Sequence, residues 1–62
     1  MFSKRLKQLR KEKKLTQKEF AELMNLSSAS IAMYETDKRS PDRETIIKMA
    51  KFFDVSIDYL LG

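Results

Sequence analysis

The stretch from Leu15 to Pro41 constrains the fold most strongly, because its residues predict two short helices joined by a tight turn. Thr16-Gln17-Lys18-Glu19 is a capping box, in which a hydroxyl and a carboxylate satisfy free amides at the start of a helix. Asn25 suits the left-handed position that ends such a helix, and Ser27 can cap the helix that follows. We therefore predict helices over residues 17–24 and 28–36, with Lys38 and Arg39 after the second.

Apolar spacing and further caps extend this pattern to five helices and require no strand. Phe2, Leu6 and Leu9 lie at helical spacing on a helix over about residues 2–13. Asp42 and Ser56 are expected to cap two more helices, the first reaching Phe53 and the second covering 57–61. The predicted fold is all-α. Its expected buried residues are Phe2, Leu6, Leu9, Phe20, Ala21, Met24, Ile31, Tyr34, Ile46, Met49, Ala50, Phe53, Leu60 and Leu61.

The composition bounds what these helices can do. A chain of 62 residues is one domain at most, and a domain that small buries only about 60% of the surface of its unfolded chain. Cysteine is absent, so disulfides and thiolate metal sites are excluded, which suits a reducing cytoplasm. No apolar run approaches the roughly 20 residues that cross a bilayer. The first 14 residues lack the apolar stretch of a secretory signal.

The same inventory argues against an enzyme. The chain contains no histidine and no cysteine, and its one glycine is Gly62, so a glycine-rich phosphate loop is impossible. Acidic pairs such as Glu19 and Glu22 are expected on a solvated helix face. We therefore expect no catalysis, no cofactor, no metal and no small-molecule substrate.

Charge is distributed unevenly along the chain. The net charge is +4, yet residues 1–14 hold seven Lys or Arg against the single acid Glu12, so the rest of the chain is net acidic. A lysine-rich helix is first of all a solvated face. An anionic polymer is the alternative interpretation, and it needs a supporting motif. A basic membrane-surface helix is less favoured, because Leu6 and Leu9 are needed in the core and no tryptophan is present.

A set of motifs in chain order supplies that support, because together they resemble the phage repressor and Cro superfamily, the XRE-type helix-turn-helix domains. The resemblance covers essentially all 62 residues. It implies a single domain over residues 1–62, a compact five-helix lambda-repressor-like fold, and a helix-turn-helix formed by the second and third helices. The motifs are Leu15-Thr16-Gln17, Leu26-Ser27, Ile31-Ala32-Met33-Tyr34-Glu35, Lys38-Arg39-Ser40-Pro41 and Phe53-Asp54-Val55-Ser56.

The chain also departs from the family pattern. Family glycines are replaced at four turn positions, namely Lys14, Asn25, Asp37 and Asp54. Asparagine and aspartate tolerate left-handed geometry, whereas Lys14 is expected to be either strained or not left-handed. Leu23 stands where the family commonly has a polar residue, so its side chain is expected to be exposed. Arg43 replaces a commonly apolar residue.

The resemblance assigns roles in sequence-specific binding of double-stranded DNA. In the family the third helix enters the major groove, and carrying its outward positions over predicts base contacts by Ser28, Ala29, Ser30, Ala32 and Met33. Predicted phosphate contacts are Gln17, Lys38, Arg39, Arg43 and Arg10. Arg10 and Glu35 are also expected to form an internal ion pair. The base-contacting set lacks side chains that grip a base bidentately, so discrimination should depend on DNA shape and repeated half-sites.

The implied function is a transcriptional regulator, most simply a repressor that binds an inverted-repeat operator as a homodimer in the cytoplasm of a bacterium. The predicted dimer contacts are Phe52, Ile57 and Tyr59 at the C-terminal end. The alternative is a DNA-binding antitoxin or regulator whose main role is to hold a protein partner. The discriminating observation is salt-dependent retention of DNA by the isolated domain, because a module that only holds a protein partner would show none.

Overall fold

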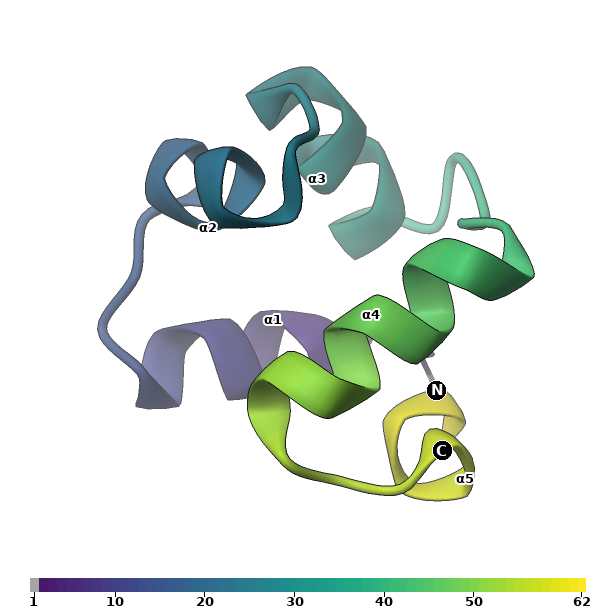
Figure 1. Ribbon diagram of the computed structural model, residues 1–62. Helices are drawn as coiled ribbons and strands as arrows, with labels where there is room; N and C mark the ends of the chain where they lie inside the picture. The colour runs from purple at the N-terminus through teal and green to yellow at the C-terminus, as the bar shows by residue number, and fades with distance from the viewer. Residues whose placement is uncertain (1) are drawn as a thin grey trace.

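The computed structural model describes residues 2–62, and over these residues the chain forms five helices and no strand (Figure 1). The all-α prediction is confirmed. The first and third helices each end one residue earlier than predicted, because the chain turns into a cap there. The helices are α1 (Phe2–Glu12), α2 (Gln17–Met24), α3 (Ser28–Glu35), α4 (Arg43–Phe53) and α5 (Ile57–Leu61).

Side-chain caps start each of the last four helices, as predicted. In α2 the Thr16 hydroxyl accepts from the Glu19 amide at 3.0 Å, while the Glu19 carboxylate accepts from the Thr16 amide at 2.8 Å. Ser27, Asp42 and Ser56 each accept from the amide three residues on. An N-cap of this kind contributes about 1 kcal/mol. Each of these four helices therefore carries its own start signal.

The first four helices all end in a left-handed residue, and none of these four residues is glycine. Their φ angles are 58° at Lys14, 60° at Asn25, 61° at Asp37 and 57° at Asp54. After each, the next amide reaches back to the carbonyl five residues earlier, the bond that defines a Schellman motif. Lys14 is thus left-handed, which settles the alternative left open by the sequence. The four bonds are Leu15 to Arg10, Leu26 to Ala21, Lys38 to Met33 and Val55 to Ala50.

Three of the connections share one design: a left-handed residue, an apolar residue and a hydroxyl cap. They are 14–16, 25–27 and 54–56, and their apolar residues are partly buried against the core. The tight turn between α2 and α3 is thus built like the link between α4 and α5. The connection after α3 differs, because an exposed lysine, Lys38, occupies the apolar position and a longer loop leads to the buried Pro41.

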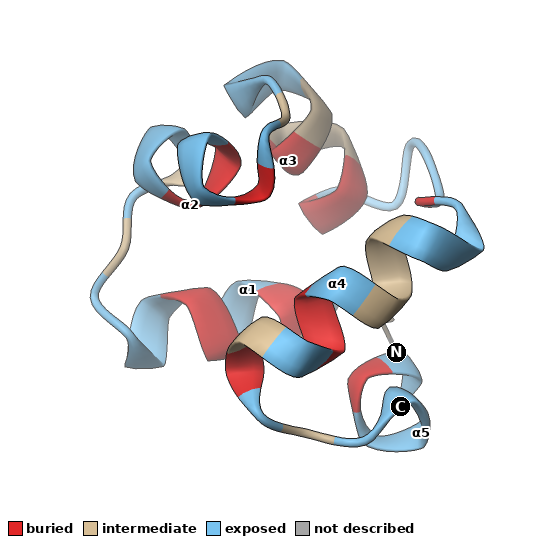
Figure 2. Cartoon of the chain, viewed as in Figure 1, coloured by how far each residue is buried: buried red, intermediate tan, exposed pale blue. Residues whose placement is uncertain are grey.

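The core draws buried side chains from every helix (Figure 2). Phe20 lies at its centre and contacts Phe53 and Phe52 at ring-centroid distances of 5.2 and 5.7 Å. Leu61, predicted to be buried, is 43% exposed, because it lies about 100° around α5 from the fully buried Leu60. The core residues are Leu6, Leu9, Phe20, Ala21, Met24, Ile31, Tyr34, Met49, Ala50, Phe53 and Leu60.

The arrangement leaves α3 on the outside of the molecule. α2 and α3 pack against each other on one side, and α1 and α5 lie on the other side, with α4 running between them (Figure 1). Phe2, Ile46 and Phe52 are only partly buried at the edge of the core. The longest of the described helices has 11 residues, and none is long and apolar enough to cross a membrane.

Replacing Lys14 by glycine should stabilise the domain by about 0.5–1 kcal/mol. The left-handed conformation costs a residue with a Cβ roughly 1–2 kcal/mol, and the greater freedom of glycine in the unfolded chain offsets about 0.4–1 kcal/mol of this. Urea unfolding followed by circular dichroism measures the change. The control is Lys7→Gly in the middle of α1, which should destabilise by about 1 kcal/mol. Destabilisation by both variants would contradict the prediction.

Candidate nucleic-acid interface

The outer face of α3 carries the residues predicted to contact bases. Ser28 and Ala29 are exposed, while Ala32 and Met33 are half-buried. The opposite face is fixed in the interior by the buried Ile31, Tyr34 and Glu35. α3 therefore presents a surface of small side chains without a cation, suited to close approach rather than to strong polar contacts.

Ser30 lies at the edge of this face and is partly committed to the fold. Its amide donates to the Ser27 hydroxyl at 3.1 Å, and its own hydroxyl accepts from the Ser27 hydroxyl at 3.0 Å. The two serines therefore form a small cap network at the start of α3. A base contact by Ser30 could use only its remaining hydrogen-bonding capacity.

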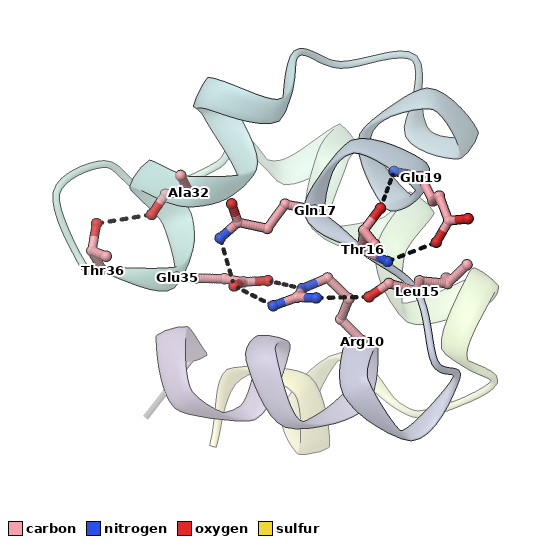
Figure 3. A network of polar contacts seen from close by, with 8 residues as sticks. All are labelled: Arg10, Leu15, Thr16, Gln17, Glu19, Ala32, Glu35 and Thr36. Carbon is pink, nitrogen blue, oxygen red and sulfur yellow. Dashed lines mark hydrogen bonds and ion pairs between the residues drawn. The ribbon is translucent and has the colours of Figure 1, made fainter.

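A buried ion pair joins α1 to α3 beneath this surface (Figure 3). Arg10 donates from Nε to Glu35 Oε2 at 2.6 Å and from Nη2 to Glu35 Oε1 at 3.1 Å. The side chains are 9% and 2% exposed. Arg10 Nη1 also donates to the Leu15 carbonyl oxygen at 2.7 Å, at the entry to α2. The expected internal pair is present, and it ties three helices together.

The burial of Arg10 argues against its predicted second role at a DNA phosphate. Its Nε, Nη1 and Nη2 atoms all donate to protein oxygens, and little of the guanidinium meets solvent. Moving it to a phosphate would leave the Glu35 carboxylate buried without its cation, which is costly. The internal ion pair is therefore the role that the structure supports for Arg10, and its phosphate contact stays a prediction.

Gln17 belongs both to this network and to the candidate phosphate site. Its Nε2 donates to Glu35 Oε1 at 3.2 Å, so the ion pair holds the half-buried side chain in place (Figure 3). Gln17 is the first residue of α2, where unpaired backbone amides and the helix dipole favour an anion. The amide group is therefore already oriented at a helix start suited to a phosphate.

Exposed cations lie after α3 and at the start of α4. Lys38 and Arg39 are exposed in the loop, and Arg43 is the exposed first residue of α4. Hydrogen bonding to the Thr45 side chain and then to its amide lowers the pKa of Asp42, and the charge of Arg39 lowers that pKa further. Arg39 precedes Asp42, the N-cap of α4, by three residues, so the basic turn is adjacent to the start of α4.

The predicted dimer residues do not form one patch. Phe52 is half-buried and packs on Phe20. Ile57 and Tyr59, which are 40% and 47% exposed, are two residues apart on α5 and therefore lie on opposite flanks. Leu61, four residues after Ile57, shares its flank. The apolar surface of α5 is thus Ile57 with Leu61, whereas Tyr59 lies beside α1.

Sequence reasoning missed two side chains that hold elements together. Arg5 donates from Nη1 to the Tyr59 carbonyl oxygen at 2.8 Å and stacks its guanidinium 4.1 Å from the Tyr59 ring centroid. Lys48 on α4 donates to the Met24 carbonyl oxygen at 2.8 Å, at the end of α2. Their partners are far away in sequence, so no local pattern could have found them.

The turn, the packing of α2 on α3 and the exposed outer face define a helix-turn-helix domain. A family model described as helix-turn-helix matches residues 6–60, and the chain belongs to this family.

Named relatives show where such domains occur. Over 59 residues the chain is 46% identical to the HTH-type transcriptional regulator ImmR of Bacillus subtilis, covering 95% of this chain and 46% of the relative. The transcriptional repressor RstR of the cryptic phage CTXphi in Vibrio cholerae is 38% identical, with coverage of 100% and 56%. The transcriptional activator BcrR of Enterococcus faecalis is 42% identical, with coverage of 98% and 30%. The chain thus spans about half the length of ImmR and RstR, and less of BcrR.

Removing one partner of the buried pair should destabilise the domain severely. Arg10→Met leaves the Glu35 carboxylate buried without a cation, and such a change costs about 3–5 kcal/mol. The double variant Arg10→Met/Glu35→Leu should recover much of this loss, because no unpaired charge remains. Urea unfolding of the two variants, with Lys11→Met as an exposed control on α1, provides the comparison. A loss below about 1 kcal/mol for Arg10→Met would mean that the pair behaves as an exposed one.

Proposed function

We propose that this domain binds duplex DNA sequence-specifically with α3 in the major groove, as part of a transcriptional regulator. The observation that carries the proposal is the small-residue outer face of α3 with exposed cations after it, in a chain of the helix-turn-helix family. A major groove about 12 Å wide accepts a helix of this kind. Relatives named as transcriptional regulators and repressors support the same function.

Phosphate contacts in this proposal come from both sides of α3. Gln17 offers its side-chain amide and the first free amides of α2 to one phosphate. Lys38, Arg39 and Arg43 offer exposed positive charge from the loop and from the start of α4. Such contacts fix the position of α3 on the duplex without reading its sequence.

Base recognition would depend on a few side chains of α3 that offer little hydrogen-bonding capacity. Ser28 can make single or water-mediated hydrogen bonds, whereas Ala29, Ala32 and Met33 can contact thymine methyl groups. With no bidentate contact from this face, much of the preference should arise from the width and deformability of the DNA.

A two-fold dimer on an inverted repeat would compensate for this sparseness. One half-site read by so few small side chains cannot supply the roughly 4–10 kcal/mol that separates specific from non-specific binding. Two copies in fixed register add their contributions, and the recognition helices would lie about 34–36 Å apart. The exposed Ile57 and Leu61 are the best candidates for the contact between copies. The patch is small, so pairing should form chiefly on DNA.

Repression is the simplest outcome, since occupancy alone blocks polymerase, although BcrR is named as an activator. The expected location is the bacterial cytoplasm, where the DNA lies. A partner-holding regulator or antitoxin is the alternative, and the salt experiment below separates it from a DNA-binding one. Nothing in the proposed function requires catalysis.

Binding to duplex DNA should weaken steeply with salt. Each neutralised phosphate releases counterions and contributes a slope of roughly −0.9 to log K against log salt. The triple variant Gln17→Ala/Lys38→Ala/Arg39→Ala should weaken binding to all sequences alike and, through its two lost cations, flatten the slope by about two units. Fluorescence anisotropy over a salt series measures both, and Lys51→Ala is an exposed control on α4. A slope near zero for the parent domain would disprove DNA binding.

Substitutions on the outer face of α3 should change site preference rather than general affinity. Met33→Ala removes apolar surface that can meet a thymine methyl group, so preference at one base position should fall while non-specific binding stays constant. Selection of bound sites from random DNA, performed in parallel for Met33→Ala, Ala29→Ser and the parent, detects the change. Identical preferences for all three proteins would shift recognition to the loop or to DNA shape.

Two chains should bind one inverted-repeat operator cooperatively. Leu61→Asp puts a charge into the proposed contact, so it should reduce cooperativity while leaving half-site affinity unchanged. Tyr59→Asp, on the other flank of α5, should have the smaller effect on cooperativity. Titration of a symmetric operator, with stoichiometry from analytical ultracentrifugation, gives the result. One chain per full site without cooperativity would exclude the dimer.

A further inference from the structure

A stripe of three lysines runs along the solvent face of α1. Lys4, Lys7 and Lys11 are exposed and line one shallow hollow together with Gln8 and Glu12. On a helix these lysines fall within about 60° of one another and are separated by about 4.5 and 6 Å along the axis. We call this surface the α1 lysine stripe.

The α1 lysine stripe lies on a lateral face of the domain and is separate from the proposed DNA-reading surface. Arg10, which points to Glu35 on α3, lies about 60–120° around α1 from the three lysines, so the stripe faces sideways relative to α3. The outer face of α3 in turn points away from Glu35 and α1. A duplex seated on the outer face of α3 would therefore lie beside the stripe and not over it. The basic N-terminal segment is thus largely unused by that duplex.

This concentration of charge does not stabilise α1. Lys4 and Lys7, and Lys7 and Lys11, are like charges at spacings that destabilise a helix by about 0.2–0.5 kcal/mol each. The first turn of α1 contains no acid to complement the helix dipole. Within residues 2–62 the one ion pair is between Arg10 and Glu35, so no carboxylate pairs with the stripe. Glu12 instead accepts a hydrogen bond from Gln8 at 3.2 Å.

We propose that the α1 lysine stripe binds the phosphate backbone of a second DNA duplex. Lysines are flexible point charges that suit non-specific phosphate contacts. The stripe offers no exposed aromatic residue and no arginine, the side chains that anchor protein interfaces. A polyanion with regularly repeated charge therefore fits this surface better than a folded protein partner does.

The proposal rests on the proposed function, because it concerns what the domain does once α3 is occupied. Each domain would then hold two duplexes on two different faces. Three phosphate contacts alone bind weakly, and a dimer on an operator would present two such stripes and so increase the avidity. The site would let bound regulators draw a second DNA segment toward the operator.

Nuclear magnetic resonance of the ¹⁵N-labelled domain tests this with a 16-base-pair random duplex as the probe. The first equivalent of duplex should shift amide signals of α3 and the loop after it. Further equivalents should then shift signals of residues 4–12. With three contacts, the dissociation constant of this second event should rise about 40-fold between 50 and 200 mM salt.

Two double variants that each remove two positive charges separate the contribution of the stripe from a general loss of charge. Lys7→Gln/Lys11→Gln should reduce the salt dependence of the second event to about threefold and leave the first event intact. Lys14→Gln/Lys51→Gln removes two exposed lysines elsewhere and should leave both events unchanged. Leu61→Asp should also leave both unchanged, since the second event does not require self-association.

Several outcomes would overturn the inference. If α3 shifts and residues 4–12 do not, the domain binds one duplex only, and the proposed function still stands. If neither region shifts, the proposed function itself fails. Shifts of residues 4–12 with poly-L-glutamate at lower concentrations than with duplex would make an acidic protein the partner instead of DNA.

Discussion

The buried ion pair between Arg10 and Glu35 is the constraint on which the rest of the structure depends. Both charges lose water, and their mutual attraction compensates only because the contacts are close and further hydrogen bonds complete them. The third contact, to the Leu15 carbonyl oxygen, fixes where α2 begins. The pair thus sets the positions of α1, α2 and α3 together, and an apolar substitute could fill the space without specifying that arrangement.

Because Glu35 anchors the inner side of α3, the outer side is left for other purposes. Gln17 is held against the same carboxylate. Glu35 therefore positions both the candidate phosphate site and the candidate base-reading face. Of the groups proposed to contact phosphates, Gln17 is held by Glu35 and Arg43 begins a capped helix, whereas the face of α3 carries only small or flexible side chains. This division suits binding in which contacts to the DNA phosphates fix the position of the protein on the duplex and contacts to the bases adjust its affinity.

The sequence predicted the features that neighbouring residues determine. Caps at Thr16 and Ser27 and the turn at Asn25 depend on contacts within five residues, so their chemistry is visible in the chain. The burial of Leu60 rather than Leu61 depends on the rotation of a five-residue helix, too short to show a period. The Arg5 contact with Tyr59 depends on how α1 meets α5, which only the fold determines. The ion pair came from family resemblance alone.

The repeated three-residue links have a consequence for how fast the domain forms. Each link carries its own stop signal, apolar anchor and start signal, so neighbouring helices such as α2 and α3 can assemble before the rest of the chain is in place. Chains dominated by such local contacts fold in microseconds to milliseconds. The slow step should be the return of α5 to α1, where the loop to be closed is longest. A molecule that opens on its DNA would therefore re-form before it diffused far from its site.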